Sequence, residues 1–407
     1  MAVVLAYTAP AIGHLFPFCA LLRELAARGH EIHVRTMASG VDLCLGEGFK
    51  AAPVDPRIEE LQSEETTRGV LRSARQTVRV LTERAVHEVD DFTAAVAAVD
   101  PDVIVVDANC WGAMSAAEAQ PRPWLVLSPF VPYLRAPGLP PFGAGAVPRR
   151  GPVGAVRDWG VGTVTRMVFD RPFSAGIAPV RASLGLAEVH SADELLRRAP
   201  RMLVATGKPF EYPHTDWGDR VHLIGPAIFD PPARQPAWLD DIDDPVVLVT
   251  TSSVGQADRA LAAAAMDAFA GDPVHVVASL PAAGDGVVRR RGNVTLAPFV
   301  PHSLVLDRAV CVVTHGGMGV TQKALDRGIP VCAVPFGRDQ FEVARRIEVA
   351  RCGVRLPARR LSAPRLRAAV QSAMTMSDGA AAVAEGFAAT GGVRRGAEVV
   401  EAFAISA

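Results

Sequence analysis

The residues best suited to chemistry are two histidines in glycine-containing segments and an aspartate at a predicted strand end. Asp107 closes the apolar run 102–107 (DVIVVD), which is typical of a central parallel strand. His14 follows the first predicted strand, so we expect both side chains at one edge of the same sheet. A carboxylate on one imidazole nitrogen makes the other nitrogen a general base near neutral pH. The structural alternative is a turn histidine beside an aspartate that caps residues 108–111.

The second histidine lies in the glycine-rich segment 314–321 (THGGMGVT), between a predicted strand and a helix. Three glycines allow several backbone N–H groups to converge at the positive end of the helix dipole. Such a turn suits a diphosphate, and His315 could donate a further hydrogen bond to a phosphate oxygen. The hydroxyls of segment 250–255 (TTSSVG) could serve the same anion site. The alternative is a glycine-rich turn without a ligand, together with ordinary Ser and Thr helix caps.

A third segment, 335–340 (PFGRDQ), follows a predicted strand and opens a helix. Asp339 and Gln340 place a carboxylate beside an amide, an arrangement that suits the hydroxyls of a sugar. The alternative for Asp339 is an ordinary helix N-cap.

The composition describes a globular protein without a charge excess. The chain has 407 residues, of which 49% are hydrophobic and 21% charged, with a formal net charge of −1. These values exclude collagen, coiled coils and disorder, and they argue against a protein that lives on nucleic acid or an anionic membrane. The six cysteines are scattered without a Cys-x-x-Cys pair, which favours free thiols in the cytoplasm. The N-terminus is predicted as a strand and not a signal peptide, and no apolar stretch reaches a membrane-spanning length.

Strand and helix alternate in both halves of the chain. This pattern predicts an α/β fold of two doubly wound, Rossmann-like domains that face each other across a cleft. We expect an N-terminal domain over 1–225, a linker over 226–245, a C-terminal domain over 246–385 and a helix over 386–407 that could cross back. The Pro- and Gly-rich segment 128–160 lacks periodicity and is predicted to be a functional loop.

The predicted elements position these chemical groups at strand ends. Strands are expected at 3–7, 31–35, 102–107, 124–127, 202–205, 221–224, 246–250, 274–278, 310–313 and 331–334. Helices are expected at 15–27, 111–119, 256–270, 321–327 and 340–350.

Several other functions of α/β proteins are excluded by missing motifs. The turn after the first strand lacks the Gly-x-Gly-x-x-Gly of dinucleotide-binding enzymes, and no Walker A sequence occurs. Two Asp-x-Asp sequences, at 100–102 and 241–243, have the letters of a manganese site. The first contains a proline and the second lies in the predicted linker, so both are predicted as solvated turns.

Residues 13–17 (GHLFP) resemble the Gly-His-x-x-Pro motif of family 1 glycosyltransferases, GT-B enzymes that decorate antibiotics and plant metabolites. Further segments follow in that family's order: 29–31 (GHE), Asp107, 225–226 (GP), 251–253 (TSS), 300–301 (VP), 315–317 (HGG) and 339–340 (DQ). The resemblance covers most of the chain and is weakest over 57–197. It is closest to the bacterial natural-product branch, whose members tailor macrolides, enediynes and aromatic polyketides.

The resemblance implies a mechanism and a set of site residues. His14, supported by Asp107, would deprotonate an acceptor hydroxyl for direct attack on the anomeric carbon with inversion. No metal or other cofactor is implied, because the glycine-rich turn would hold the diphosphate of the nucleotide-sugar donor. The predicted donor-binding residues are Thr251, Ser252, Ser253, Phe299, Val300, His302, His315, Gly316, Gly317, Met318, Gly319, Val320, Asp339 and Gln340.

Five positions depart from the common pattern of that family. Thr251 stands in place of glycine, and Val320 in place of threonine or serine. Phe299 replaces a tryptophan that stacks on the base, and His302 replaces a glutamine. Lys323 falls where plant enzymes that use UDP-sugars carry a glutamate to the ribose hydroxyls. Because a thymidine nucleotide lacks the 2′-hydroxyl, we expect a dTDP-linked deoxysugar in preference to UDP-glucose.

The acceptor side is predicted from aromatic residues of the variable region. The residues expected to line an apolar acceptor pocket, or else to form plain core, are Trp111, Phe130, Tyr133, Phe142 and Trp159. The expected partners are a nucleotide sugar and a hydrophobic natural product, with no nucleic acid and no membrane span, and a homodimer is left open. Two alternatives are a GT-B UDP-sugar 2-epimerase and a catalytically silent nucleotide-sugar-binding subunit that activates a partner.

Overall fold

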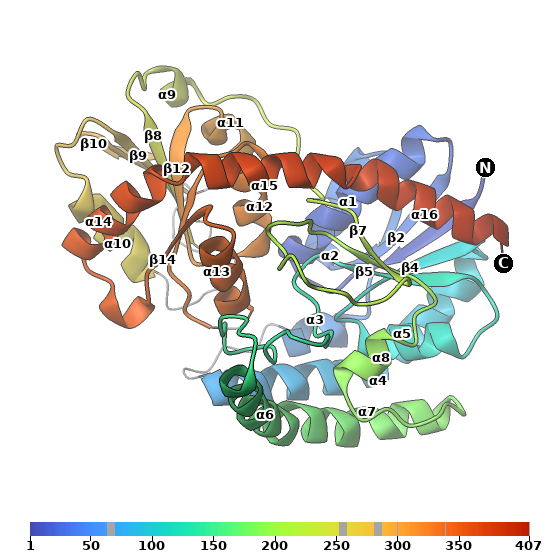
Figure 1. Ribbon diagram of the computed structural model, residues 1–407. Helices are drawn as coiled ribbons and strands as arrows, with labels where there is room; N and C mark the ends of the chain where they lie inside the picture. The colour runs from blue at the N-terminus through green and yellow to red at the C-terminus, as the bar shows by residue number, and fades with distance from the viewer. Residues whose placement is uncertain (63–69, 252–258, 281–286, 299, 338, 407) are drawn as a thin grey trace.

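The computed structural model of the protein has a sheet flanked by helices in each half of the chain (Figure 1). The structure describes residues 1–62, 70–251, 259–280, 287–298, 300–337 and 339–406. Both sheets are doubly wound, as the alternation of strands and helices predicts. The α/β fold class is therefore confirmed.

The N-terminal sheet is parallel throughout. Its strands are β1 (Val3–Tyr7), β2 (Glu31–Thr36), β3 (Lys50–Pro53), β4 (Val103–Asp107), β5 (Trp124–Ser128), β6 (Met202–Val204) and β7 (Val221–Leu223). Their order across the sheet is β3-β2-β1-β4-β5-β6-β7. The order reverses beside β1, so the carboxyl ends of β1 and β4 lie next to each other at the switch point, where open α/β sheets bind ligands.

Two hydrophobic cores cover the faces of this sheet. The helices of this half are α1 (Ile12–Ala27), α2 (Ala38–Gly46), α3 (Pro56–Gln62), α4 (Val70–Val99), α5 (Trp111–Glu118), α6 (Pro152–Thr165), α7 (Arg171–Ser183) and α8 (Ala192–Leu196), with the π-helical η1 (Arg166–Asp170) between α6 and α7. On β1, Leu5 and Tyr7 face the core under α4, α5 and α7, whereas Val4 and Ala6 face the core under α1 and α2. This alternation is the period-two pattern of a strand buried on both faces.

The C-terminal sheet has the same switch beside β8. Its strands are β8 (Val246–Thr250), β9 (His275–Ser279), β10 (Arg289–Arg291), β11 (Val294–Ala297), β12 (Ala309–Thr314), β13 (Val331–Ala333) and β14 (Gly353–Arg355), in the order β10-β11-β9-β8-β12-β13-β14. The remaining helices are α9 (Ala237–Asp240), α10 (Arg259–Ala268), α11 (His302–Leu306), α12 (Met318–Asp326), α13 (Gln340–Val349), α14 (Ala363–Met374), α15 (Ser377–Ala389) and α16 (Gly392–Ser406), with the 3₁₀ turn η2 (Ala358–Arg360).

The chain ends on the half in which it began. Helix α15 spans the two halves and α16 packs on α1, so the two termini lie near each other (Figure 1). Glu401 of α16 contacts Arg28 at 2.8 Å and His30 at 2.9 Å, just beyond α1. Within the described ranges, no helix is both long and apolar enough to cross a membrane.

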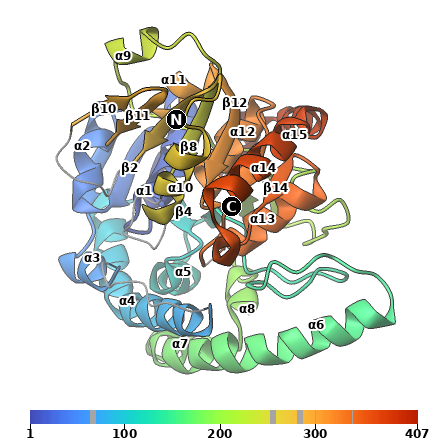
Figure 2. The same ribbon diagram turned by 90° about the vertical axis from the view of Figure 1, so that its left-hand side faces the viewer.

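The structure corrects several predicted boundaries. Helix α1 begins at Ile12, so His14 lies in its first turn and not in the preceding loop. The predicted loop 128–160 includes the start of α6, which continues through η1 into α7 as one long rod (Figure 2). The sequence patterns also missed the short strands β3, β10, β11 and β14. The edge strand β10 (Arg289–Arg291) carries exposed polar residues and no apolar alternation. The inner strand β11 is mostly buried but has only four residues, too few for a clear pattern.

Candidate active site

His14 and Asp107 meet at the carboxyl edge of the N-terminal sheet. His14 Nδ1 lies 2.8 Å from Asp107 Oδ2, and Asp107 is fully buried whereas the His14 side chain is 20% exposed. Asp107 Oδ1 accepts the backbone N–H of Asn109 at 2.8 Å, which fixes the carboxylate from its other side. Because a carboxylate occupies Nδ1, His14 Nε2 remains available to exchange a proton with a molecule in the cavity.

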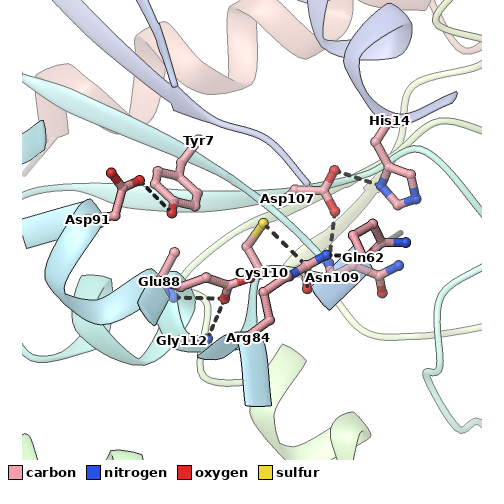
Figure 3. A network of polar contacts seen from close by, with 11 residues as sticks. Tyr7, His14, Gln62, Arg84, Glu88, Asp91, Asp107, Asn109, Cys110 and Gly112 are labelled. Atoms are coloured by element: carbon pink, nitrogen blue, oxygen red, sulfur yellow. Dashed lines mark hydrogen bonds and ion pairs between the residues drawn. The ribbon is translucent and has the colours of Figure 1, made fainter. Parts of the chain in front are cut away.

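A buried ion pair supports the turn that follows β4 (Figure 3). Arg84 of α4 donates from Nε to Glu88 Oε1 at 2.6 Å, and both side chains are fully buried. Arg84 also donates to the carbonyl oxygen of Asn109, and Glu88 Oε2 accepts the N–H of Gly112 at 2.8 Å in the first turn of α5. Burial raises the pKa of Glu88 above its ordinary value, although the charge of Arg84 opposes this shift.

Gly112 is required where α5 approaches α4. A Cβ atom at this position would lie 2.0 Å from the carbonyl oxygen of Ala85. Any side chain would push α5 away from α4 and remove the N–H of Gly112 from Glu88. The position of the Asp107 turn therefore depends on close backbone packing as well as on the ion pair.

A cavity of about 1000 Å³ extends from His14 into the C-terminal half. The aromatic rings of Phe130, Tyr133 and Phe142 line its N-terminal side. The Phe130 ring centroid lies 5.5 Å from that of His14, and the Tyr133 and Phe142 centroids are 4.7 Å apart. A space of this size with an apolar wall and a few polar groups is typical of a small-molecule site.

The glycine-rich turn lies on the opposite side of the cavity. It joins β12 to α12, whose N-cap is Gly317, and Gly316 takes a φ of +91° that favours glycine. His315, Gly317 and Gly319 line the cavity, so the positive end of the α12 dipole faces the space. Thr250 and Ser279 also line the cavity. Their hydroxyl oxygens are buried and have no hydrogen-bond partner among the described residues.

A lysine–aspartate pair lines the cavity beside α12. Lys323 of α12 donates from Nζ to Asp230 Oδ1, and Asp230 Oδ2 accepts the hydroxyl of Ser303. Burial would raise the pKa of Asp230, but Lys323 and Ser303 hold it below its ordinary value. His302 lies beside this pair, and burial together with the Lys323 charge lowers the pKa of its imidazole to about 4. His302 is therefore neutral at physiological pH.

Comparisons with known proteins find chains of similar sequence and similar fold. Residues 263–402 match the family described as erythromycin biosynthesis protein CIII-like, C-terminal domain. The chain is 29% identical over 387 residues to 4′-demethylrebeccamycin synthase of Lentzea aerocolonigenes, with 91% of each chain covered. The fold matches the glycosyltransferase of kitacinnamycin with a TM-score of 0.77 at 22% identity, covering 99% of both chains. It also matches the glycosyltransferase VinC, solved with dTDP, with a TM-score of 0.71 at 20% identity, covering both chains fully.

The chain is a GT-B glycosyltransferase. The matched family is named for erythromycin biosynthesis, and the long relative for the synthesis of 4′-demethylrebeccamycin. The resemblance drawn from the motifs is thereby confirmed.

Most residues predicted for the donor lie together in the glycosyltransferase. The predicted donor residues that line the cavity are Thr251, Val300, His302, His315, Gly317, Met318, Gly319, Val320, Asp339 and Gln340. Gly316 shapes the turn but is not among the residues that line the cavity. Gln340 covers it, because a Cβ atom at position 316 would lie 3.1 Å from the carbonyl oxygen of Gln340. Ser252, Ser253 and Phe299 lie outside the described residues.

Of the five aromatic residues predicted for the acceptor side, three line the cavity and two do not. Phe130, Tyr133 and Phe142 line the cavity of the glycosyltransferase. Trp111 instead is fully buried in the N-terminal core, with its ring centroid 4.8 Å from that of Phe173. Trp159 lies on the outer face of α6 with 71% of its surface exposed. An aromatic residue carries no sequence signal for which side of its helix faces a cavity.

Sequence reasoning missed several groups of this site. Arg84 and Glu88 lie four residues apart on a helix that was not predicted, so nothing connected them with Asp107. Asp230 lies in the linker and was read only as part of a Pro- and Asp-rich segment. Ser279 directly follows the predicted strand 274–278, and this strand-end position is the signal that could have found it. The described residues contain no cluster of three or more His, Cys, Asp or Glu side chains that could hold a metal ion.

Proposed function

We propose that this glycosyltransferase moves a deoxysugar from a dTDP-linked donor to a hydroxyl of a hydrophobic natural product, with inversion and without a metal. The observation that carries the proposal is the contact of 2.8 Å between His14 and Asp107, beside a cavity that the glycine-rich turn also lines. A base and an anion site on opposite walls of one space suit a direct displacement.

In the proposed step His14 Nε2 takes the proton of the acceptor hydroxyl while the oxygen attacks the anomeric carbon. The bond from that carbon to the diphosphate breaks on the opposite face, and dTDP leaves with the electron pair. Asp107 stabilises the imidazolium that forms. The N–H groups at the start of α12, with His315, are placed to stabilise the charge on the departing diphosphate.

Two observations support the preference for a thymidine nucleotide. Lys323 is held by Asp230, so this position offers an ammonium group where a carboxylate would bind a 2′-hydroxyl. The structurally similar VinC was solved with dTDP. The aromatic rings around His14 support an apolar acceptor, and the buried free cysteines are consistent with the cytoplasm as the location.

Thermal unfolding with dTDP, UDP and dUDP tests the donor assignment. A nucleotide at about 100 times its Kd stabilises the folded state by about 2.7 kcal/mol, a Tm rise of roughly 2–4 °C for a protein of this size. We expect this rise with dTDP and less with UDP, in the presence of EDTA. A larger rise with UDP would favour the epimerase, and none with any nucleotide would remove the donor assignment.

Product analysis separates the enzyme from a silent subunit. A β-linked product from an α-linked donor is the expected outcome of a single displacement, and retention would contradict it. If the protein binds the nucleotide but shows no turnover, and if His14 variants bind the nucleotide as the wild type does, the subunit that only activates a partner would be favoured.

A further inference from the structure

Glu342 joins the acceptor side of the cavity to the helix of the donor side. Its side chain is buried, and Oε1 accepts two backbone N–H groups, from Gly143 at 2.9 Å and from Gly145 at 2.8 Å. The two glycines belong to the N-terminal half, about 200 residues away along the chain. A buried carboxylate that receives two amide donors holds a backbone segment much more firmly than a neutral contact would.

The loop is shaped to fit against α13. Gly145 has a φ of +54°, and a Cβ atom there would lie 2.3 Å from the carbonyl oxygen of Phe341. The carbonyl oxygen of Gly145 accepts a hydrogen bond from Arg345 Nε at 2.7 Å. Three hydrogen bonds and a position that admits only glycine thus bind this loop to one face of α13.

A second charge completes the contact between the halves. Glu342 Oε2 lies 3.2 Å from Arg346, whose guanidinium group binds both oxygens of Glu211 at 2.8 and 3.0 Å. Glu211 follows β6 in the N-terminal half, and all three side chains are buried. Burial alone would lower the pKa of Arg346, but Glu211 and Glu342 raise it, so the guanidinium stays charged.

Both ends of this contact reach the cavity. Phe142, directly before Gly143, lines the acceptor side and packs edge-on against Tyr133. Asp339 and Gln340, three and two residues before Glu342, line the donor side. A shift of the loop relative to α13 would therefore move the acceptor wall relative to the residues expected to hold the donor sugar.

We propose that Glu342 is a positioning residue that fixes the 143–145 loop, and with it the acceptor side of the cavity, against α13. The first residues of α13 are those expected to hold the donor sugar. The assignment of α13 to the donor sugar rests on the function proposed above. The fixing of the loop by Glu342 does not.

Hydrogen exchange measured by mass spectrometry tests this role without knowledge of the acceptor. E342Q keeps the shape of the side chain but removes its charge and turns an amide toward Arg346. G145A attacks the same contact from the loop side, because its Cβ atom meets Phe341. E348Q is the matched control, a carboxylate-to-amide change on the same helix in a partly exposed pair with Arg345.

Without ligand, we expect the amides of a peptide over 142–147 to exchange at least about tenfold faster in E342Q and G145A than in the wild type and E348Q. Equal exchange in E342Q and the wild type would overturn the proposal. Circular dichroism and Tm show whether each variant is folded. If E342Q does not fold, G145A decides between the two outcomes.

With dTDP-glucose as the probe, a merely structural contact and a positioning contact give different results. In the wild type we expect protection both at the 315–323 turn and at the 142–147 loop. In E342Q the turn should remain protected and the loop should lose its donor-dependent protection. Protection of the turn in the wild type without any change in the loop would overturn the link to the donor site. Absence of protection at both places would count against the proposed donor, and the comparison without ligand would still judge the role of Glu342.

Discussion

The two walls of the cavity present different kinds of chemical group. The N-terminal wall places the proposed base, His14, on a fully buried aspartate, and the charges of Arg84 and Glu88 support the turn beneath it. The C-terminal wall presents backbone N–H groups, two buried hydroxyls and a lysine–aspartate pair. The first wall thus concentrates its chemistry in one side chain, whereas the second distributes binding over many groups. Single substitutions should therefore have larger effects on turnover at the first wall than on binding at the second.

The largest expected effect is that of H14A. Removing the general base should lower kcat by about 10²- to 10⁴-fold, because proton transfer from the acceptor loses its catalyst. The affinity for dTDP, measured by calorimetry, should stay unchanged, because His14 belongs to the other wall. H33A is the matched control, since His33 pairs with Glu31 on β2 and does not line the cavity. An equal loss of dTDP affinity in H14A would remove the distinction between the two walls.

Disruption of the Arg84–Glu88 ion pair below Asp107 should cause the largest loss in the free energy of unfolding. R84M leaves Glu88 buried without its counter-charge and should cost about 3–5 kcal/mol in urea unfolding. The double variant R84M/E88L replaces the pair by apolar side chains and should recover much of that loss. The double variant also removes the acceptor of the Gly112 N–H. We therefore expect its kcat to be lower than that of the wild type even though its stability returns. Recovery of both quantities together would show that the ion pair acts on stability alone.

The C-terminal wall should respond to pH through His302. Its folded-state pKa of about 4 lies below the ordinary value of 6.5, so the fold favours the neutral imidazole. Between these values the unfolded chain binds more protons, and stability should fall as pH drops from about 6.5 to 4. The loss should not exceed about 3.4 kcal/mol. In H302Q this part of the pH dependence of unfolding should vanish, and an unchanged pH profile would contradict the assignment.

The smallest expected effect is a change of nucleotide preference. K323E/D230N places a carboxylate at 323 and removes the one at 230, so that two carboxylates do not meet, and it offers a carboxylate to a 2′-hydroxyl. The UDP affinity should rise about tenfold relative to dTDP, as expected for one hydrogen bond to a charged group. Binding of dUDP, which lacks that hydroxyl, should not gain, and this ligand is the internal control. An equal gain for dUDP would assign the change to general charge and not to the ribose.

The comparison also separates what patterns can predict from what they cannot. Asp107 and His14 were predicted together because strand ends of a parallel sheet share one edge, and the structure places them 2.8 Å apart. The same reasoning brought the glycine-rich turn and Asp339 to the second sheet. The aromatic residues of the variable region follow no such pattern, and Trp111 packs inside the core whereas Trp159 faces solvent. Whether an aromatic side chain lies in the core, at the surface or in the cavity wall depends on neighbours that are distant in sequence.

The sequence by itself determined the fold class and pointed to the residues proposed to carry the chemistry. Alternating strands and helices, strand-end polar residues and glycine spacing are local patterns, and local backbone physics is sufficient to interpret them. The tertiary structure decided which buried charges support that chemistry. Glu342 meets Gly143 across 199 residues, and Lys323 meets Asp230 across 93 residues. Charges are buried only where packing supplies a partner of opposite sign or a row of N–H groups, and that condition belongs to the assembled molecule.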